Sequence, residues 1–329
     1  MVVVAFFIRH FTERGTEVAI YDYAHFNETI LGNKSIILCL TPEAQKLHKL
    51  PNMRHSFKKF NDRFSVVEFG GFNEMPVLIK TLDIDFFYTL TYGGYGDIYD
   101  FNNRNIWTCK TIKHCVFDTT GKEGDHYIAI GNSSNPKNYA VVPHIVYLPS
   151  LENTGSLDMR SELNIPENAV VFGRHGGIDE FNIQFVKQAV IHTLETQPDY
   201  YFIFLNTNKF HTHPRIIYLD MTTDLQYKVR FINTCDAMIH ARSMGESFGV
   251  AVGEFSFMNK PIFTSNQGDT EHIRILGEKA VVYKNYDELI TKFANAREIV
   301  SSRLDWNAYK NYSPEAVMEL FQTHIFNSL

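Results

Sequence analysis

Short apolar runs alternate along the chain with longer stretches that mix apolar and polar residues. In the first half these runs cover 2–8, 35–40, 64–67, 85–90 and 111–117. Runs that are apolar at nearly every position are typical of strands buried on both faces, as in a parallel sheet. The helical lengths between them predict a repeated βαβ pattern.

A stretch rich in Pro, Asn and Ser between 132 and 150 interrupts this rhythm and places a domain boundary near 148–155. The same alternation then resumes. The strands expected there cover 169–172, 200–205, 216–219, 237–241, 261–264 and 280–283. The helices expected there cover 181–196, 224–234, 247–258, 271–276 and 286–297, and a last helix is expected at 314–326.

The predicted fold class is α/β, with two facing Rossmann-like, doubly wound domains. We expect the first domain at 1–150, the second at 151–305, and a C-terminal helix within 306–329 that can pack back on the first domain. Ligands of such folds bind beyond the carboxyl ends of the strands, so the site is expected between the two halves.

Charge and cysteine content limit the possible binding partners and the cellular compartment. The 329 residues include Lys+Arg 31 and Asp+Glu 37, a formal net charge of -6 that argues against a nucleic-acid partner. The four cysteines lie far apart without a CxxC pair, which argues against a disulfide scaffold and favours a cytoplasmic protein. The run 2–8 is too short to span a bilayer, and no other run approaches about 18 apolar residues, so no transmembrane segment is expected.

One predicted helix carries the strongest chemical signal. Between 247 and 258 Glu254 is the only ionisable residue, and apolar side chains surround the helix, which is typical of a buried element. Burying a carboxylate without a partner is costly, so something polar must meet Glu254. Glu246 precedes it by eight positions, about 12 Å along a helix axis at roughly 1.5 Å per residue. The alternative is that Glu246 is a solvated loop acid and Glu254 an ion-paired core acid.

Between these carboxylates the expected helix N-terminus offers the free amides of Ser247, Phe248 and Gly249. Such amides bind anions without a cationic side chain. The spacing is near the span of a sugar joined through a pyrophosphate to a ribose. It predicts carboxylates for hydroxyl groups at each end and amides for phosphates in the middle.

The sequence from Glu246 to Glu254 matches the E-x7-E motif of retaining GT-B glycosyltransferases and resembles glycosyltransferase family 4. The stretches 260–264 and 267–271 are similar to the family's continuation, and the match covers about 170–285. The resemblance implies that Glu246 holds the donor sugar, Glu254 the ribose hydroxyls and the helix amides the phosphates.

Gly173 and Arg174 end a predicted strand and resemble the family's Gly-Arg turn, whose arginine contacts the pyrophosphate. The resemblance implies that Arg174 neutralises charge on the leaving nucleotide. Where the family usually has a lysine five or six residues later, this chain has Asp179 and Glu180. A surface ion pair is the alternative role for Arg174.

Other donor contacts are expected at neighbouring strand ends. Lys209 and Arg242 are the candidate substitutes for the missing lysine, and the nucleotide base is expected near 219–222, at Met221. In the first half, Gly15 lies within 14–17, where the family has a glycine-rich loop close to the donor phosphates.

Two further features of the first half have open alternatives. His114, at the end of the strand 111–117, resembles the family histidine near the sugar, and a core or surface histidine is equally compatible. The glycine-rich stretch 91–97 is expected either to line the acceptor cleft or to form a plain turn.

No metal site is expected. His211 and His213 lack a third ligand nearby and are interpreted as loop residues. The Asp-x-Asp at Asp83 and Asp85 leads directly into an apolar strand.

These observations predict a retaining, metal-independent glycosyltransferase that moves a hexose from a nucleotide-diphosphate sugar to a hydroxyl of a glycan or other acceptor. The resemblance implies a GDP-sugar such as GDP-mannose in preference to a UDP-sugar, with no further cofactor. It assigns the acceptor side to 1–150 and the donor side to 151–305. A non-catalytic two-lobed binding protein and a nucleotide-sugar epimerase are the alternatives, and a homodimer is one assembly considered.

Overall fold

The computed structural model describes residues 1–12, 15–50, 54–94, 97–133, 135, 138–150, 157–302 and 304–327. Two compact units make up the chain: Met1–Ile145 with Tyr312–Leu329, and Val146–Asn311. The divisions expected from the sequence lie after 150 and after 305. Residues 151–155 of the expected boundary region lie outside the described residues.

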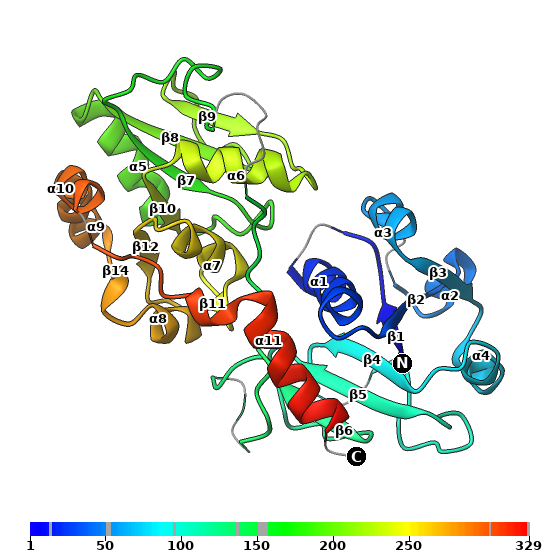
Figure 1. The fold of residues 1–329 in the computed structure, drawn as a ribbon. Helices are drawn as coiled ribbons and strands as arrows, with labels where there is room; N and C mark the ends of the chain where they lie inside the picture. The colour runs from blue at the N-terminus through cyan, green and yellow to red at the C-terminus, as the bar shows by residue number, and fades with distance from the viewer. Residues whose placement is uncertain are drawn as a thin grey trace. The chain divides into compact units, whose positions relative to one another are not determined.

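The first unit is built on a six-stranded parallel sheet with the order β3-β2-β1-β4-β5-β6 (Figure 1). Its strands are β1 (Val3–Ile8), β2 (Lys34–Leu40), β3 (Ser65–Phe69), β4 (Phe86–Thr91), β5 (Lys110–Cys115) and β6 (His126–Ala129). Its helices before the second unit are α1 (Gly15–Thr29), α2 (Pro42–Leu47), α3 (Phe57–Arg63) and α4 (Met75–Thr81), with a 3-10 turn at Phe72–Glu74. β1 and β4 are buried along their whole length, which explains their continuous apolar runs.

The C-terminal helix α11 (Pro314–Phe321) belongs to this first unit although it comes last in the sequence. The ring of Phe321 lies 5.4 Å from that of Tyr23 in α1 and 5.9 Å from that of Tyr88 in β4. Figure 1 shows this helix, in red, beside the strands β4 to β6. The helix continues as a π-helix over Gln322–Phe326, so the predicted helix at 314–326 consists of two helical forms.

The second unit repeats the architecture with the parallel order β14-β12-β10-β7-β8-β9. Its strands are β7 (Val170–Arg174), β8 (Tyr200–Leu205), β9 (Ile216–Leu219), β10 (Ala237–His240), β12 (Ile262–Ser265) and β14 (Ala280–Tyr283). Its helices are α5 (Gln184–Thr196), α6 (Leu225–Thr234), α7 (Val250–Phe257), α8 (Glu271–Leu276), α9 (Tyr286–Ala294) and α10 (Ala296–Ser301), with 3-10 turns at Gly277–Lys279 and Lys310–Tyr312. A two-stranded ribbon pairs β11 (Gly245–Glu246) with β13 (Asp269–Thr270). Counted from its own first strand, this sheet has the same order as the first.

The two doubly wound parallel sheets confirm the predicted α/β fold class. The bounds of β8, β9, β14 and α8 are those expected from the sequence. Two predicted helices begin later than expected, α5 at Gln184 rather than 181 and α7 at Val250 rather than 247. Gly249 explains the second shift, because its φ of 79° is left-handed and cannot continue a right-handed helix. The strand β6 was not predicted.

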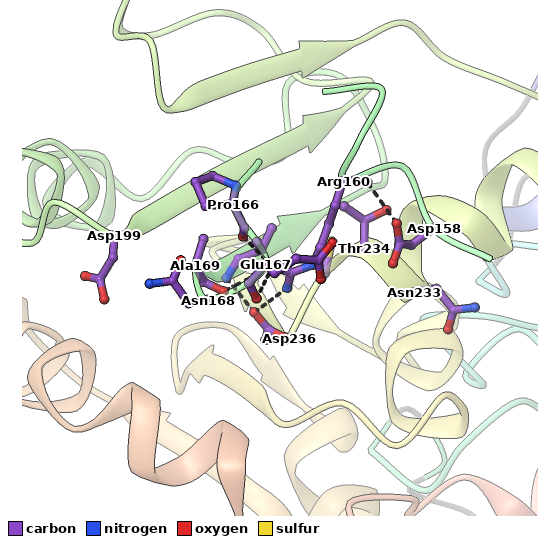
Figure 2. Close-up of polar contacts among 12 residues, drawn as sticks. Asp158, Arg160, Pro166, Glu167, Asn168, Ala169, Asp199, Asn233, Thr234 and Asp236 are labelled. Carbon is purple, nitrogen blue, oxygen red and sulfur yellow. Dashed lines mark hydrogen bonds and ion pairs between the residues drawn. The ribbon is translucent and has the colours of Figure 1, made fainter. Parts of the chain in front are cut away.

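One arginine fastens the start of the second unit to the amino ends of β7 and β10 (Figure 2). Arg160 donates to three backbone carbonyls in the segment 166–169, at 3.2 to 3.4 Å. It also donates to Asp236 Oδ2 at 2.9 Å, and the same oxygen accepts from the Val171 amide at 2.7 Å. This guanidinium therefore mainly satisfies main-chain acceptors, and it fixes the backbone that leads into β7.

In the part of the chain that the structure describes, no helix combines the length and the apolarity needed to cross a membrane.

Candidate functional site

The shared topology of the two sheets points to a place for a ligand. Each sheet has a switch point, where strands added on opposite sides meet: between β1 and β4 in the first unit and between β7 and β10 in the second. Open parallel sheets bind ligands beyond the carboxyl ends of the strands at such a point. In the second unit the chain leaving β7 and β10 carries a group of charged side chains. We call this region of the second unit the carboxyl edge.

Glu254 of α7 is buried, with 2% of its surface exposed. Its Oε1 accepts a hydrogen bond from Lys228 Nζ of α6 at 2.6 Å. Its Oε2 lies 2.9 Å from His175 Nε2, without the alignment of a hydrogen bond. Burial alone would raise the pKa of Glu254, but the positive charge of Lys228 and the adjacent His175 outweigh burial and hold this pKa at about 2. The carboxylate is therefore ionised, and one of its oxygens has no aligned donor among the described residues.

Glu246 of β11 is held by two groups at once. Its Oε1 accepts from His240 Nε2 at 3.2 Å, and its Oε2 accepts from Arg242 at 2.8 Å. Burial would raise the pKa of Glu246, but the hydrogen bond from His240 and the charges of His240 and Arg242 lower it overall. A carboxylate has about four lone-pair sites, so two remain for hydroxyl groups of a ligand.

The segment between the two glutamates differs from the expectation. Because α7 begins at Val250, Ser247 and Phe248 lie before the helix and are buried. The Phe248 carbonyl accepts from the Tyr309 hydroxyl at 2.7 Å. The free amides of the helix N-terminus therefore belong to 250–252 rather than 247–249, and the axial rise of a helix does not separate the glutamates. No side chain caps this N-terminus, because the N-cap residue is Gly249.

Arg174 ends β7 and is buried rather than exposed. It donates to the backbone carbonyls of Asn206 and Gly177 at 3.0 and 2.7 Å and to Thr207 Oγ1 at 2.6 Å. Three of its five donors are thus engaged within the protein. Burial lowers the pKa of Arg174 to about 10, so the group stays charged. It braces the turn after β7 and keeps two donors for a ligand.

Gly173 is required by packing within the second unit. A Cβ at this position would lie 2.2 Å from Cys235 Sγ and 3.1 Å from the Phe255 ring. The glycine therefore lets β7 approach α7 closely, and its part in donor binding remains a prediction.

Two predicted donor contacts lie farther along the sheet. Lys209 follows β8 and is exposed, with its ammonium 5.9 Å from the centre of the Tyr218 ring. Met221 follows β9 and is 48% exposed. These positions are one and two strands away from β7 in the sheet order.

The charges of the carboxyl edge are matched in number. The group consists of Arg174, Arg242, Lys228, Glu180, Glu246 and Glu254. Arg242 contacts both Glu246 and Glu180, and Lys228 contacts Glu254. The formal charges within the group cancel, so the group offers spare N–H donors rather than surplus positive charge.

His114 in the first unit is a core residue, and the expectation that it reaches a sugar does not fit this position. It is fully buried, with Nδ1 2.7 Å from the Tyr88 hydroxyl and Nε2 2.8 Å from the Val142 carbonyl. Burial lowers the pKa of His114 to about 3, so the ring is neutral. Both ring nitrogens are already used. The strand end alone did not reveal that the ring points into the core.

The other first-half candidates lie partly outside the described residues. Gly15 is the first residue of α1, and Arg14 before it is not described. In the stretch 91–97, Tyr95 and Gly96 are not described. Near this stretch, the buried ammonium of Lys113 contacts Asp97 and Glu123, a network that the sequence did not indicate.

Among the described residues, no group of three His, Cys, Asp or Glu side chains is placed to hold a metal ion. Asp85 accepts from the Val3 amide at 2.8 Å, at the amino end of the sheet, which is the end opposite to the expected ligand position. His211 and His213 stack with ring centres 6.4 Å apart. The four cysteines are buried and free.

Sequence reasoning missed several members of the carboxyl edge. Lys228 pairs with a carboxylate 26 residues away, and no motif spacing links them. His175 follows Arg174 in the turn already identified, so adjacency was the available signal. His240 lies in the predicted strand 237–241, where no local pattern distinguishes it.

Comparison with known proteins gives a fold. No protein-family model matches the sequence, and no curated protein sequence matches it. Solved structures do match over nearly the whole chain. A glycosyltransferase from Rickettsia africae has a TM-score of 0.71 at 13% identity, covering 99% of each chain. Anabaena HepE in complex with UDP-glucose has a TM-score of 0.74 at 12% identity, covering 100% of each chain. WaaG, a glycosyltransferase involved in lipopolysaccharide biosynthesis, has a TM-score of 0.63 at 11% identity, covering 98% of this chain and 99% of that one.

These likenesses, together with the two equivalent sheets, show that the chain has the GT-B glycosyltransferase fold with two Rossmann-like domains. Because fold does not fix activity, function has to be argued from the carboxyl edge itself.

Proposed function

We propose that this chain is a retaining glycosyltransferase that moves a hexose from a nucleoside-diphosphate sugar to a hydroxyl acceptor and needs no divalent metal. The observation that carries the proposal is the pair of ionised, largely buried glutamates at the carboxyl edge of a GT-B fold. An ionised carboxylate accepts hydrogen bonds from hydroxyl groups, which sugars and ribose supply.

Each glutamate keeps accepting capacity for a ligand. Glu246 has lone pairs left beside His240 and Arg242, and we assign it to the transferred sugar. Glu254 has an oxygen without an aligned donor, and we assign it to the ribose. Unfilled accepting capacity in a buried, charged group is costly, so a ligand hydroxyl there would be stabilised.

The diphosphate would be met by neutral and cationic donors together. The uncapped start of α7 supplies amides at 250–252. Arg174 supplies its remaining N–H groups. Lys228 has three ammonium donors, of which Glu254 takes one, so we favour Lys228 over exposed Lys209 as the substitute for the missing lysine. These groups would stabilise the leaving nucleotide, which is the main demand of the reaction.

The donor base is the next question for this site. HepE was solved with UDP-glucose and with UDP, which supports a uridine donor, whereas the resemblance to family 4 favours GDP-mannose. Calorimetric titration with UDP, GDP, UDP-glucose and GDP-mannose separates the two. We expect one base to bind at least tenfold more tightly than the other. Equal and negligible binding of all four would contradict the proposal.

Turnover is tested with the preferred donor. Slow release of sugar from the donor, or transfer to added glycans, is expected to continue after exhaustive EDTA treatment, with the product keeping the anomeric configuration of the donor by NMR. Loss of activity in EDTA, restored by manganese and absent from Asp83→Ala, would contradict metal independence. Tight binding without turnover would indicate a binding protein, and a changed sugar still linked to nucleotide would indicate an epimerase.

A further inference from the structure

Behind Glu246 lies a chain of three buried side chains that the donor site does not account for. His240 Nε2 lies 3.2 Å from Glu246 Oε1, and His240 Nδ1 lies 2.9 Å from Thr264 Oγ1. The same hydroxyl lies 2.8 Å from His272 Nε2. The two histidine rings are 4.9 Å apart between centres. These groups come from β10, β12 and α8, and His240 and Thr264 lie at the carboxyl ends of their strands.

The positions of the hydrogens on these three side chains follow from the Glu246 carboxylate, which they approach at one end. A carboxylate can only accept, so His240 carries a proton on Nε2 that points at Glu246. In a ring with one proton His240 Nδ1 is then an acceptor, and the Thr264 hydroxyl, which also faces the Ser265 carbonyl at 3.3 Å, donates to the nearer His240 Nδ1 at 2.9 Å. Thr264 Oγ1 can in turn only accept from His272, which places the His272 proton on Nε2. Every hydrogen bond thus runs in one direction and ends on Glu246.

Burying three polar side chains costs folding free energy, so a role beyond packing is expected for them. Thr264 and His272 are fully buried, and His240 is 5% exposed. Burial lowers the pKa of His272 to about 3, which keeps that ring neutral. His272 Nδ1 makes no aligned hydrogen bond among the described residues, and backbone groups of Glu246 and Asp269 lie next to this ring. An apolar trio would fill this core with no polar group to satisfy, so packing alone does not explain the three polar groups.

The second oxygen of Glu246 is fixed separately. Arg242 donates to Oε2 at 2.8 Å and is itself tied to Glu180 at 3.2 Å. His240 is the group on Oε1, and without a fixed tautomer its ring could present an acceptor to the carboxylate instead of a donor. The direction of the Thr264 hydroxyl removes that freedom.

We propose that Thr264 and His272 are positioning residues, which hold His240 in the Nε2–H tautomer so that Glu246 presents its remaining lone pairs to the transferred sugar. This inference rests on the proposed function for the role of Glu246. It separates two parts of donor binding, because the chain acts on the sugar end and not on the nucleotide.

The test compares Thr264→Val with Thr264→Ser. Valine keeps the shape and removes the hydroxyl, whereas serine keeps the hydroxyl. Since a misplacement of about 1 Å at a reacting group can cost roughly 100-fold, we expect Thr264→Val to lower kcat for sugar release or transfer by about 10- to 100-fold. Affinity for the free nucleoside diphosphate should stay within about twofold, and Thr264→Ser should restore most of the rate. Equal rates in the valine variant and the unaltered protein, or no rescue by serine, would overturn the proposal.

A second measurement needs no substrate. Nitrogen-15 NMR of the unaltered protein near neutral pH should show both His240 and His272 protonated on Nε2 and bare on Nδ1, with Thr264→Ser used to assign the signals. A proton on Nδ1 of either ring would overturn the proposal. If the protein shows no turnover of any nucleotide sugar, the proposed function fails, while the tautomers still decide whether the chain of hydrogen bonds is directed at Glu246.

Discussion

The two ends of the sheet in the second unit both bury an arginine with carboxylates, but they use these groups differently. At the amino end, Arg160 donates to three main-chain carbonyls and to Asp236, which accepts from a strand amide (Figure 2). At the carboxyl edge the contacts of Arg242 and Lys228 are to side chains. Among the described residues, three buried atoms at the carboxyl edge lack an aligned hydrogen-bond partner: Glu254 Oε2, His175 Nε2 and His272 Nδ1.

This difference links the amino end of the sheet to the stability of the fold and the carboxyl edge to ligand binding. Backbone carbonyls at strand ends are fixed by the fold, so a guanidinium that donates to several of them holds the fold. Side-chain partners can share their lone pairs and donors with a ligand. Orphaned buried atoms are destabilising in the free protein, which is the usual pattern of a functional site. We therefore expect variants at the amino end to change unfolding and variants at the carboxyl edge to change binding.

The largest effect is expected at the amino end. Arg160→Met would remove a donor from three carbonyls and the cationic partner from Asp236, and breaking a buried pair of this kind costs about 3–5 kcal/mol of unfolding free energy. We expect a loss of about 3 kcal/mol, since Asp236 is partly exposed, measured by urea unfolding.

The matched control is Arg297→Met, which removes an exposed arginine that contacts Asp199 and the Asn168 carbonyl. We expect it to change the unfolding free energy by at most about 0.5 kcal/mol. Nucleotide affinity of the folded Arg160 variant should be unaltered. A stable Arg160 variant that has lost nucleotide binding would abolish the distinction between the two ends.

An acid titration tests the carboxyl edge in the same comparison. The pKa of folded Glu254 is about 2, below the ordinary value of about 4.3 for glutamate. A lowered acid pKa stabilises the fold above the ordinary value, and this contribution is lost as the pH falls towards the folded pKa. Between pH 5 and pH 3 the unaltered protein should lose about 2 kcal/mol more stability than Glu254→Gln. Parallel losses in urea unfolding would show that Glu254 is not held ionised by its partners.

A binding effect of similar or smaller size is expected from the same substitution. Glu254→Gln should weaken binding of the free nucleotide and of the nucleotide sugar alike, by about 1–3 kcal/mol for a lost charged hydrogen bond to the ribose. Calorimetry measures both. Asp236→Asn is the control, a matched change at the amino end that should leave affinity unaltered. Unchanged affinity for the free nucleotide in Glu254→Gln would remove Glu254 from the ribose site.

The smallest effect is expected at Arg174, which is braced by backbone contacts like Arg160 but belongs to the carboxyl edge. If its spare donors act on the leaving diphosphate, Arg174→Ala should lower kcat about tenfold and raise KM less. Arg174→Lys tests the same role with less disturbance, because it keeps the charge and loses the planar fork. Full activity in both variants, together with inactivity of Lys209→Ala, would transfer the role to Lys209.

The candidate site was partly predictable from single positions. Glu254 stood out because one acid in an otherwise apolar helix must have a polar partner. The identity of that partner was not predictable, since Lys228 reaches it from another helix across the packed unit. His114 shows the opposite failure, because a histidine at a strand end has the same local sequence whether its ring faces the core or the edge. The start of α7 depends on the left-handed backbone of Gly249. The sequence around Gly249 is compatible with a helix that begins at 247 or at 250.

By itself the sequence determined the α/β class, the alternation of strands and helices, and the two glutamates that define the carboxyl edge. These follow from local rules: continuous apolar runs make doubly covered strands, and an isolated buried charge demands a partner. Only the tertiary structure decided which groups meet. Lys228 and His175 on Glu254, and the His272 to Thr264 to His240 chain on Glu246, are brought together from different strands and helices. Hydrogen bonds and ion pairs act over a few ångströms, so the folding of distant segments onto one sheet edge decides them and local sequence does not.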